Sequence, residues 1–295
     1  MTDVIEANQL IFSDMRVRRV LTWNSSQWGG LFVFEDCCSK RSAEAIQNFS
    51  FGSSSMVSHS TLTAREHSLT AYRFDVLRGI SGPEKLAFPS TVRDFVSNTV
   101  DYGLQCFTGC PRSIFKILTD VLSTGKAWLA DHLSTEIFQV ILSQSAQRLH
   151  DWDMHQEDFP DSDPGWPLLA DAYRHTALLR ILRFPDTFLV PASDPSIKNS
   201  VDRILDISAL ISQDSPCYKR LVFPLFMAGA DTNSPHQQRY VQMCLGQIKD
   251  STRIAQPALF ELLDTVKQAR ASSSQDRNVP WMEWVCVALP CDLWS

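Results

Sequence analysis

The densest group of side chains that could do chemistry lies between residues 150 and 163. It contains carboxylates with two interleaved histidines: Asp151, Asp153, Glu157, Asp158, Asp161, Asp163, His150 and His155. Such a group could bind a divalent cation, or a carboxylate and a histidine could transfer protons. The segment lacks the regular alternation and the late glutamate of a calcium loop, and Pro160 and Pro164 interrupt it. We therefore favour a solvated loop between two helices.

His175 and the cysteines are the other side chains with chemical potential. His175 is isolated within a helical pattern, which favours a hydrogen-bonded or exposed histidine over a general base. The pairs Cys106/Cys110 and Cys286/Cys291 have three and four residues between their members. A structural zinc site needs four ligands, and no second pair stands at a matching spacing. We expect the cysteines to pack as small apolar side chains and assign no metal ligand.

Sequence motifs of common enzyme classes do not occur in the chain. There is no GxxxxGK[ST] or GxGxxG phosphate-binding pattern and no GxSxG nucleophile turn. The eight tryptophans could stack on an aromatic ligand, but in a helical protein of this size they mostly fill the core. The chain is therefore predicted not to be an enzyme. No catalytic residue is assigned, and cofactor-binding residues are unknown.

Composition and charge favour a globular intracellular protein. The chain has 295 residues, 44% of them hydrophobic and 20% charged, which is typical of one large domain or two ordinary ones. A net charge of −6 with 27 scattered basic residues argues against a DNA-binding surface, because such surfaces cluster Lys and Arg. The N-terminus does not read as a secretory signal, and no segment reads as transmembrane. The eight cysteines are then reduced thiols.

The pattern along the chain predicts an all-α domain over residues 71–295. It follows a poorly defined segment, 1–70, in which 17–21 and 31–34 could be strands or helix fragments. Residues 48–70 are rich in Ser and Thr and read as a linker. Beyond residue 70, apolar side chains recur at helical spacing. The predicted helices begin near residues 71, 90, 111, 134, 167, 196, 221, 234 and 257.

The most apolar run, LVFPLFMAGA at residues 221–230, reads as a central core helix. Ten apolar residues are too few to cross a bilayer, which needs about 20. Pro224 lies near the start, where a helix tolerates proline. Gly229 suits either a C-cap or a close approach between two helices.

The order of several weak motifs resembles the fungal-specific transcription factor domain, the helical regulatory region of zinc binuclear-cluster regulators. TGCP at residues 108–111 and IFKIL at 114–118 resemble its opening. AYRHTALL at 172–179 is similar to its next segment. The run at 221–230, with Arg239 downstream, resembles its "wPlfiaG.ea….R" segment, and WMEW at 281–284 resembles its closing tryptophans. The resemblance spans residues 105–288.

This resemblance implies an all-α fold, a nuclear location and a role in transcriptional control. Members of the family usually bind DNA through an N-terminal cluster of six cysteines holding two zinc ions. Here only Cys37 and Cys38 precede residue 105, with no basic run after them. We therefore expect no zinc cofactor in this chain and no direct DNA binding by it alone. A lost cysteine-rich exon, a regulator acting through a partner, and a reused domain all remain open. The family's helical domain supplies no catalytic residues, and Arg239 is expected to anchor a loop or a carboxylate.

Three functions follow from these observations. The first is a regulatory module that binds a protein partner or senses a small-molecule effector in a pocket between helices. The second is an all-α enzyme acting on a hydrophobic small molecule in secondary metabolism, with residues 150–163 or His175 transferring protons. The third is a dimerisation domain that forms a homodimer. We place the first ahead of the second, and none of them involves a membrane.

Overall fold

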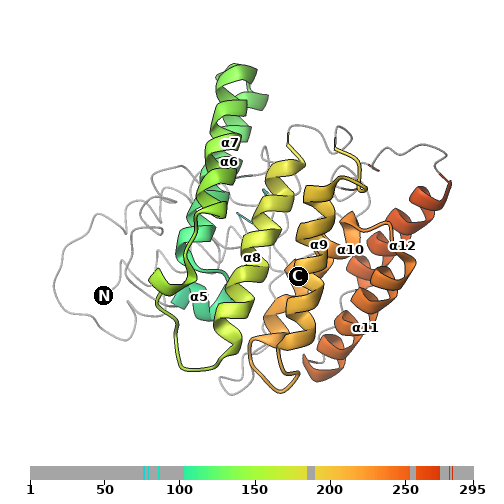
Figure 1. Ribbon diagram of the computed structural model, residues 1–295. Helices are drawn as coiled ribbons and strands as arrows, with labels where there is room; N and C mark the ends of the chain where they lie inside the picture. The colour runs from blue at the N-terminus through green and yellow to red at the C-terminus, as the bar shows by residue number, and fades with distance from the viewer. Residues whose placement is uncertain are drawn as a thin grey trace, which may run out of the picture.

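Helices side by side make up the described part of the chain (Figure 1). The computed structural model describes residues 103–184, 190–252 and 257–272, with Val76, Gly79, Leu86, Val279 and Trp281 as single positions. No strand occurs within these residues, which confirms the all-α prediction. None of their helices is long and apolar enough to span a membrane.

The array runs from the hairpin of α6 and α7 at one end, through α8, α9 and α10, to α11 and α12 at the other. Short 3-10 turns lie at Met154–Gln156 and Tyr218–Leu221 (η2 and η3). The α-helices are α5 (Gly103–Thr108), α6 (Arg112–Leu129), α7 (Thr135–His150), α8 (Gly165–Leu182), α9 (Pro195–Leu210), α10 (Val222–Asp231), α11 (Pro235–Thr252) and α12 (Pro257–Ser272).

Local signals place most helix starts close to their predicted positions. Ser134 caps α7 by accepting a hydrogen bond from the backbone N–H of Ile137. Helix α9 begins at Pro195, one residue before the predicted start near 196, because Asp194 caps it and the proline takes the first helical position. Helix α8 begins at Gly165, two residues before the predicted start at 167, because Asp163 in the preceding loop accepts a hydrogen bond from the Gly165 backbone N–H.

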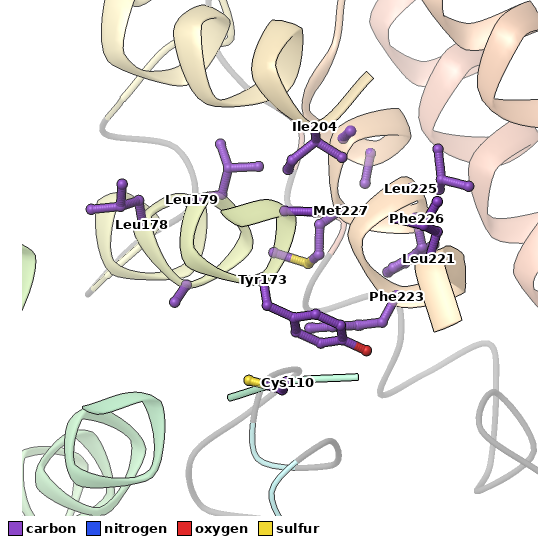
Figure 2. Close-up of a cluster of buried hydrophobic side chains, with 14 of the residues drawn as sticks. Cys110, Tyr173, Leu178, Leu179, Ile204, Leu221, Phe223, Leu225, Phe226 and Met227 are labelled. Atoms are coloured by element: carbon purple, nitrogen blue, oxygen red, sulfur yellow. The ribbon is translucent and has the colours of Figure 1, made fainter. Parts of the chain in front are cut away.

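The apolar run at 221–230 is a core helix, as predicted. Every residue of α10 from Phe223 to Asp231 is buried. Met227 points toward Leu179 of α8, whereas Leu225 and Phe226 lie on the opposite side of α10 (Figure 2). Gly229 lies within the helix rather than at a cap. A Cβ atom there would lie 2.8 Å from Cγ1 of Val241, so this glycine permits the close approach of α11.

Several predictions fall wholly or partly outside the described residues. These are the segments 17–21 and 31–34, the linker 48–70, the helix starting near 90, the pair Cys286/Cys291 and the tryptophan at 284. The helix predicted over 71–80 is described only at Val76 and Gly79, both helical and buried. A Cβ at Gly79 would lie 2.6 Å from Cδ2 of Leu86, and Lys126 of α6 donates a hydrogen bond to the Leu86 carbonyl.

Candidate functional site

The second half of the acidic segment holds the start of α8. Asp163 accepts hydrogen bonds from the Gly165 backbone N–H at 2.7 Å and from the Ser215 hydroxyl at 2.9 Å. Asp161 accepts from the Trp166 indole N–H and from the Asp163 backbone N–H, both at 2.8 Å. The bond from Gly165 satisfies one of the N–H groups that a helix start leaves without partners. Asp163 therefore holds the first residue of α8, and Asp161 holds Asp163 and the Trp166 side chain.

Side chains in the first half of the segment form hydrogen bonds with Ser113 of α6. The Trp152 indole N–H lies 3.0 Å from both Oε1 of Glu157 and Oγ of Ser113, and Ser113 also donates to Glu157. Asp153 accepts the His155 backbone N–H at 2.9 Å, a bond that lowers the pKa of Asp153. Within the described part of the chain, no three His, Cys, Asp or Glu side chains form a group that could hold a metal ion.

His175 belongs to a separate polar cluster between α8 and α9. Its Nε2 lies 2.9 Å from the Arg174 guanidinium and 3.8 Å from the Asp171 carboxylate. Its Nδ1 lies 3.3 Å from Oγ of Ser200. Arg174 and Arg203 also bind the two oxygens of Asp171, at 2.7 to 2.9 Å. His175 is buried, whereas Asp151, Asp153 and His155 are exposed, so the structure does not unite these four in one site.

The hydrogen bonds around His175 define its protonation state. A guanidinium can only donate, so Nε2 accepts from Arg174, and Nδ1 carries the proton and donates to Ser200. Burial, together with the Arg174 charge, lowers the pKa of His175 to about 4. The ring is thus neutral at pH 7, and in this tautomer it cannot take a proton from the Ser200 hydroxyl. A Ser, a His and an Asp side chain are close together here, and their contacts link α8 to α9.

The structure contains a third polar cluster that was not predicted from the sequence. It is formed by Arg183, Asp231, Arg270 and Trp281. Oδ1 of Asp231 lies 3.0 Å from Nε and 2.9 Å from a terminal nitrogen of Arg183, and both side chains are fully buried. Oδ1 also accepts the Trp281 indole N–H at 3.3 Å. Arg270 lies 3.9 Å from the same oxygen and donates to the Thr232 carbonyl at 2.8 Å.

This cluster joins the C-terminal ends of three helices. Arg183 is the C-cap residue of α8, Asp231 ends α10, and Arg270 lies in the last turn of α12. The C-terminus of a helix carries a partial negative charge, which favours nearby cations and disfavours a carboxylate. The Asp231 carboxylate at the end of α10 therefore needs positively charged partners. Burial lowers the pKa of Arg270 to about 10, with Asp231 acting in the opposite direction, so the guanidinium stays charged at neutral pH. The sequence carried one signal for this cluster, an acidic residue directly after the most apolar helix.

The GCP motif forms a tight junction against α8. The Tyr173 hydroxyl donates to the Thr108 carbonyl at 2.5 Å and lies 3.2 Å from the Arg220 carbonyl. Gly109 has a positive φ of 81°, and a Cβ there would lie 2.7 Å from a methyl group of Leu169. Cys110 is buried beside it, and burial raises the pKa of its thiol. Only glycine fits this position without strain.

Three motif segments far apart in sequence thus pack around α10. Tyr173, from the AYR segment, lies between the GCP junction and Phe223 of α10, whose ring centroid is 6.2 Å away (Figure 2). Trp281 packs edge-on against Phe226 at 5.5 Å. A family model described as "Fungal specific transcription factor domain" matches residues 25–283. The chain belongs to this family. Neither a curated protein nor a solved structure matches it.

The motifs of this fungal-specific transcription factor domain are therefore packing elements of the fold. Arg239, which the family pattern marks downstream of the core helix, is different. It is exposed on α11, and no ion pair between it and a carboxylate occurs among the described residues, so its role as an anchor of a loop or a carboxylate stays a prediction.

Proposed function

We propose that this chain is a regulatory module for transcription in the nucleus, acting through a protein partner or a small-molecule effector rather than through its own contacts with DNA. The observation that carries the proposal is the family match over residues 25–283. The motifs that define the family lie in the core around α10, so they maintain the fold. Recognition then falls to the surface or to a space between helices.

The state of the polar clusters supports a regulatory role over a catalytic one. A general base must accept a proton near working pH. His175 has a pKa of about 4 and directs its protonated nitrogen at Ser200. The carboxylate of Asp163 accepts a hydrogen bond from the Gly165 backbone N–H, and that of Asp161 accepts one from the Trp166 indole N–H.

The use of arginine side chains supports action without direct DNA contact. Binding to DNA requires Lys and Arg that are free to neutralise phosphates. Here Arg174 and Arg203 bind Asp171, and Arg183 binds Asp231. Arg220 donates to the carbonyls of Cys106 and Pro216 and packs over the Trp166 ring. The net charge of −6 adds a repulsive field.

A tethering assay tests the proposed role. The whole chain is fused to a heterologous DNA-binding domain, and a reporter gene is measured across nutrient conditions. We expect the fusion to change transcription. The Asp231→Asn variant, which breaks the buried cluster, should lose the effect, whereas the exposed variant Asp214→Asn should keep it. A wild-type fusion that leaves the reporter unchanged under every condition would refute the role.

A gel-shift assay with the purified chain tests the DNA question separately. We expect no sequence-selective complex, only weak binding that disappears as salt is raised. Tight and selective binding to one DNA sequence would contradict this part of the proposal.

A further inference from the structure

The outer face of α11 carries a narrow stripe of side chains opposite the core. The core-facing residues of this helix are Val241, Cys244, Leu245 and Ile248. On the opposite side, at intervals of four, three and four residues, lie Arg239, Met243, Gly246 and Asp250. This spacing keeps the four residues on one line along the helix, as in the seam of a two-helix contact. Helix α11 lies toward the end of the array away from α6 and α7 (Figure 1).

At Gly246 an added side chain would meet none of the described residues. A Cβ atom at this position would meet nothing within 4 Å, whereas at Gly229 it would collide with Val241. Glycine is unfavourable in a helix interior relative to alanine, and a glycine there usually has a packing or functional reason. Met243, one turn away, is 51% exposed. The stripe therefore places an exposed apolar side chain one turn from a position that has no side chain.

We infer that α11 packs antiparallel against α11 of a second copy of this chain, across a two-fold axis between residues 244 and 245. In such a contact each residue meets the one that is equally far from the axis on the other helix. Met243 then lies over Gly246 of the second copy, and Arg239 meets Asp250 of the second copy. The two-fold axis repeats both contacts, so the interface contains two Met243–Gly246 contacts and two Arg239–Asp250 pairs.

The charges of the stripe favour a second copy over an unrelated partner. Arg239 and Asp250 are both exposed, and neither forms an ion pair with another described residue. Arg239 lies at one end of the stripe and Asp250 at the other. An antiparallel copy therefore places each charge opposite a charge of the other sign. An acidic or a basic partner would satisfy only one end.

The neighbouring helix α9 extends the same surface. Three contacts align α9 alongside α11 in the same direction: Asp202 with Gln237, Ser208 with Tyr240, and Gln213 with Gln247. This register brings Leu210 level with Met243. Leu210 is 63% exposed, so α9 also carries exposed apolar surface.

Sedimentation velocity of the full chain over a range of concentrations tests the inference. We expect a concentration-dependent dimer. Arg239→Asp and Asp250→Arg should each give a monomer. In either variant two side chains of the same charge face each other at both symmetry-related contacts. A mixture of the two variants should form a heterodimer, because both pairs become opposite in sign. The control Arg148→Asp, on exposed α7 away from α11, should dimerise like the wild type.

Substitutions at Gly246 separate dimerisation from folding. Gly246→Leu adds a bulky side chain where Met243 of the second copy would lie, so it should shift the dimer to monomer. Helix content and thermal stability should be retained, because no described residue is displaced. A monomeric wild type at every concentration, a dimer unaffected by Arg239→Asp, or a failure of the two charge variants to associate would each overturn the inference. None of these measurements involves a promoter, so they are independent of the transcriptional role.

Discussion

Arg183 and Asp231 form an ion pair whose side chains have no exposed surface, although 48 residues separate them. A buried pair adds little net stability compared with apolar residues, but removing one partner leaves an uncompensated charge. Here the pair also receives Arg270 and Trp281. It therefore acts as the common anchor for the ends of α8, α10 and α12.

Asp231→Asn should destabilise the domain strongly. The substitution keeps the side-chain shape but leaves Arg183 and Arg270 without their buried counter-charge, at a cost of about 3–5 kcal/mol. The free energy of unfolding from chemical denaturation measures the effect. Asp214→Asn is the matched control, because Asp214 is exposed and its change should stay within about 0.5 kcal/mol. Equal stabilities for the two variants would show that the cluster does not anchor the fold.

Local sequence signals were enough to predict most of the helices. Ser134 and Pro235 mark helix starts by capping and by a fixed φ, and apolar spacing marks the buried faces. The helix at 221–230 was found because an uninterrupted apolar run is buried whatever surrounds it. Exact starts were less certain at α8 and α9, where Asp163 and Asp194 decide the first turn.

The polar clusters could not be predicted in the same way. The partners of Asp231 come from residues 39 to 50 positions away, and periodicity carries no information about contacts at that distance. His175 was expected to be hydrogen-bonded or exposed, and it is buried and hydrogen-bonded. Its neutral state depends first on burial and then on the charge of Arg174, and only the fold reveals both.

The stability of the domain should fall as pH is lowered from about 6.5 toward 4. The folded-state pKa of His175 is about 4, below its unfolded value of about 6.5. Between these values unfolding takes up a proton, so the free energy of unfolding decreases as pH falls, by up to about 3 kcal/mol. The pKa of Asp171 is also shifted. Burial raises it, but the hydrogen bonds from Arg174 and Arg203 outweigh burial and leave it below its usual value. Asp171 therefore reduces the stability only at a lower pH than His175 does.

Denaturant titrations of the wild type and of His175→Gln across this pH range measure the effect. The glutamine variant lacks the titrating ring. The stability difference between the two proteins should therefore shrink as pH falls. A difference that stays constant from pH 7 to pH 4 would show that His175 titrates normally in the folded chain.

Alanine at two glycines should have opposite effects on stability. Gly109→Ala introduces a Cβ at a positive φ and within 2.7 Å of Leu169, which should cost about 1–3 kcal/mol. Gly246→Ala places its Cβ in open space and should stabilise α11 by up to about 1 kcal/mol. Thermal unfolding at a low, fixed protein concentration compares them. If both variants were destabilised, the outer face of α11 would not be open.

Phe226→Asp should prevent the domain from folding. Phe226 is 1% exposed at the centre of α10, and its ring packs edge-on against Trp281. An aspartate there would place an unpaired charge in an apolar core, at a cost of several kcal/mol against a total stability of about 5–15 kcal/mol. Circular dichroism and solubility measure the outcome, and Phe226→Leu, which keeps the site apolar, should remain folded. A soluble, fully helical Phe226→Asp protein would show that α10 is not the central helix, because a buried charge in that helix could not be tolerated.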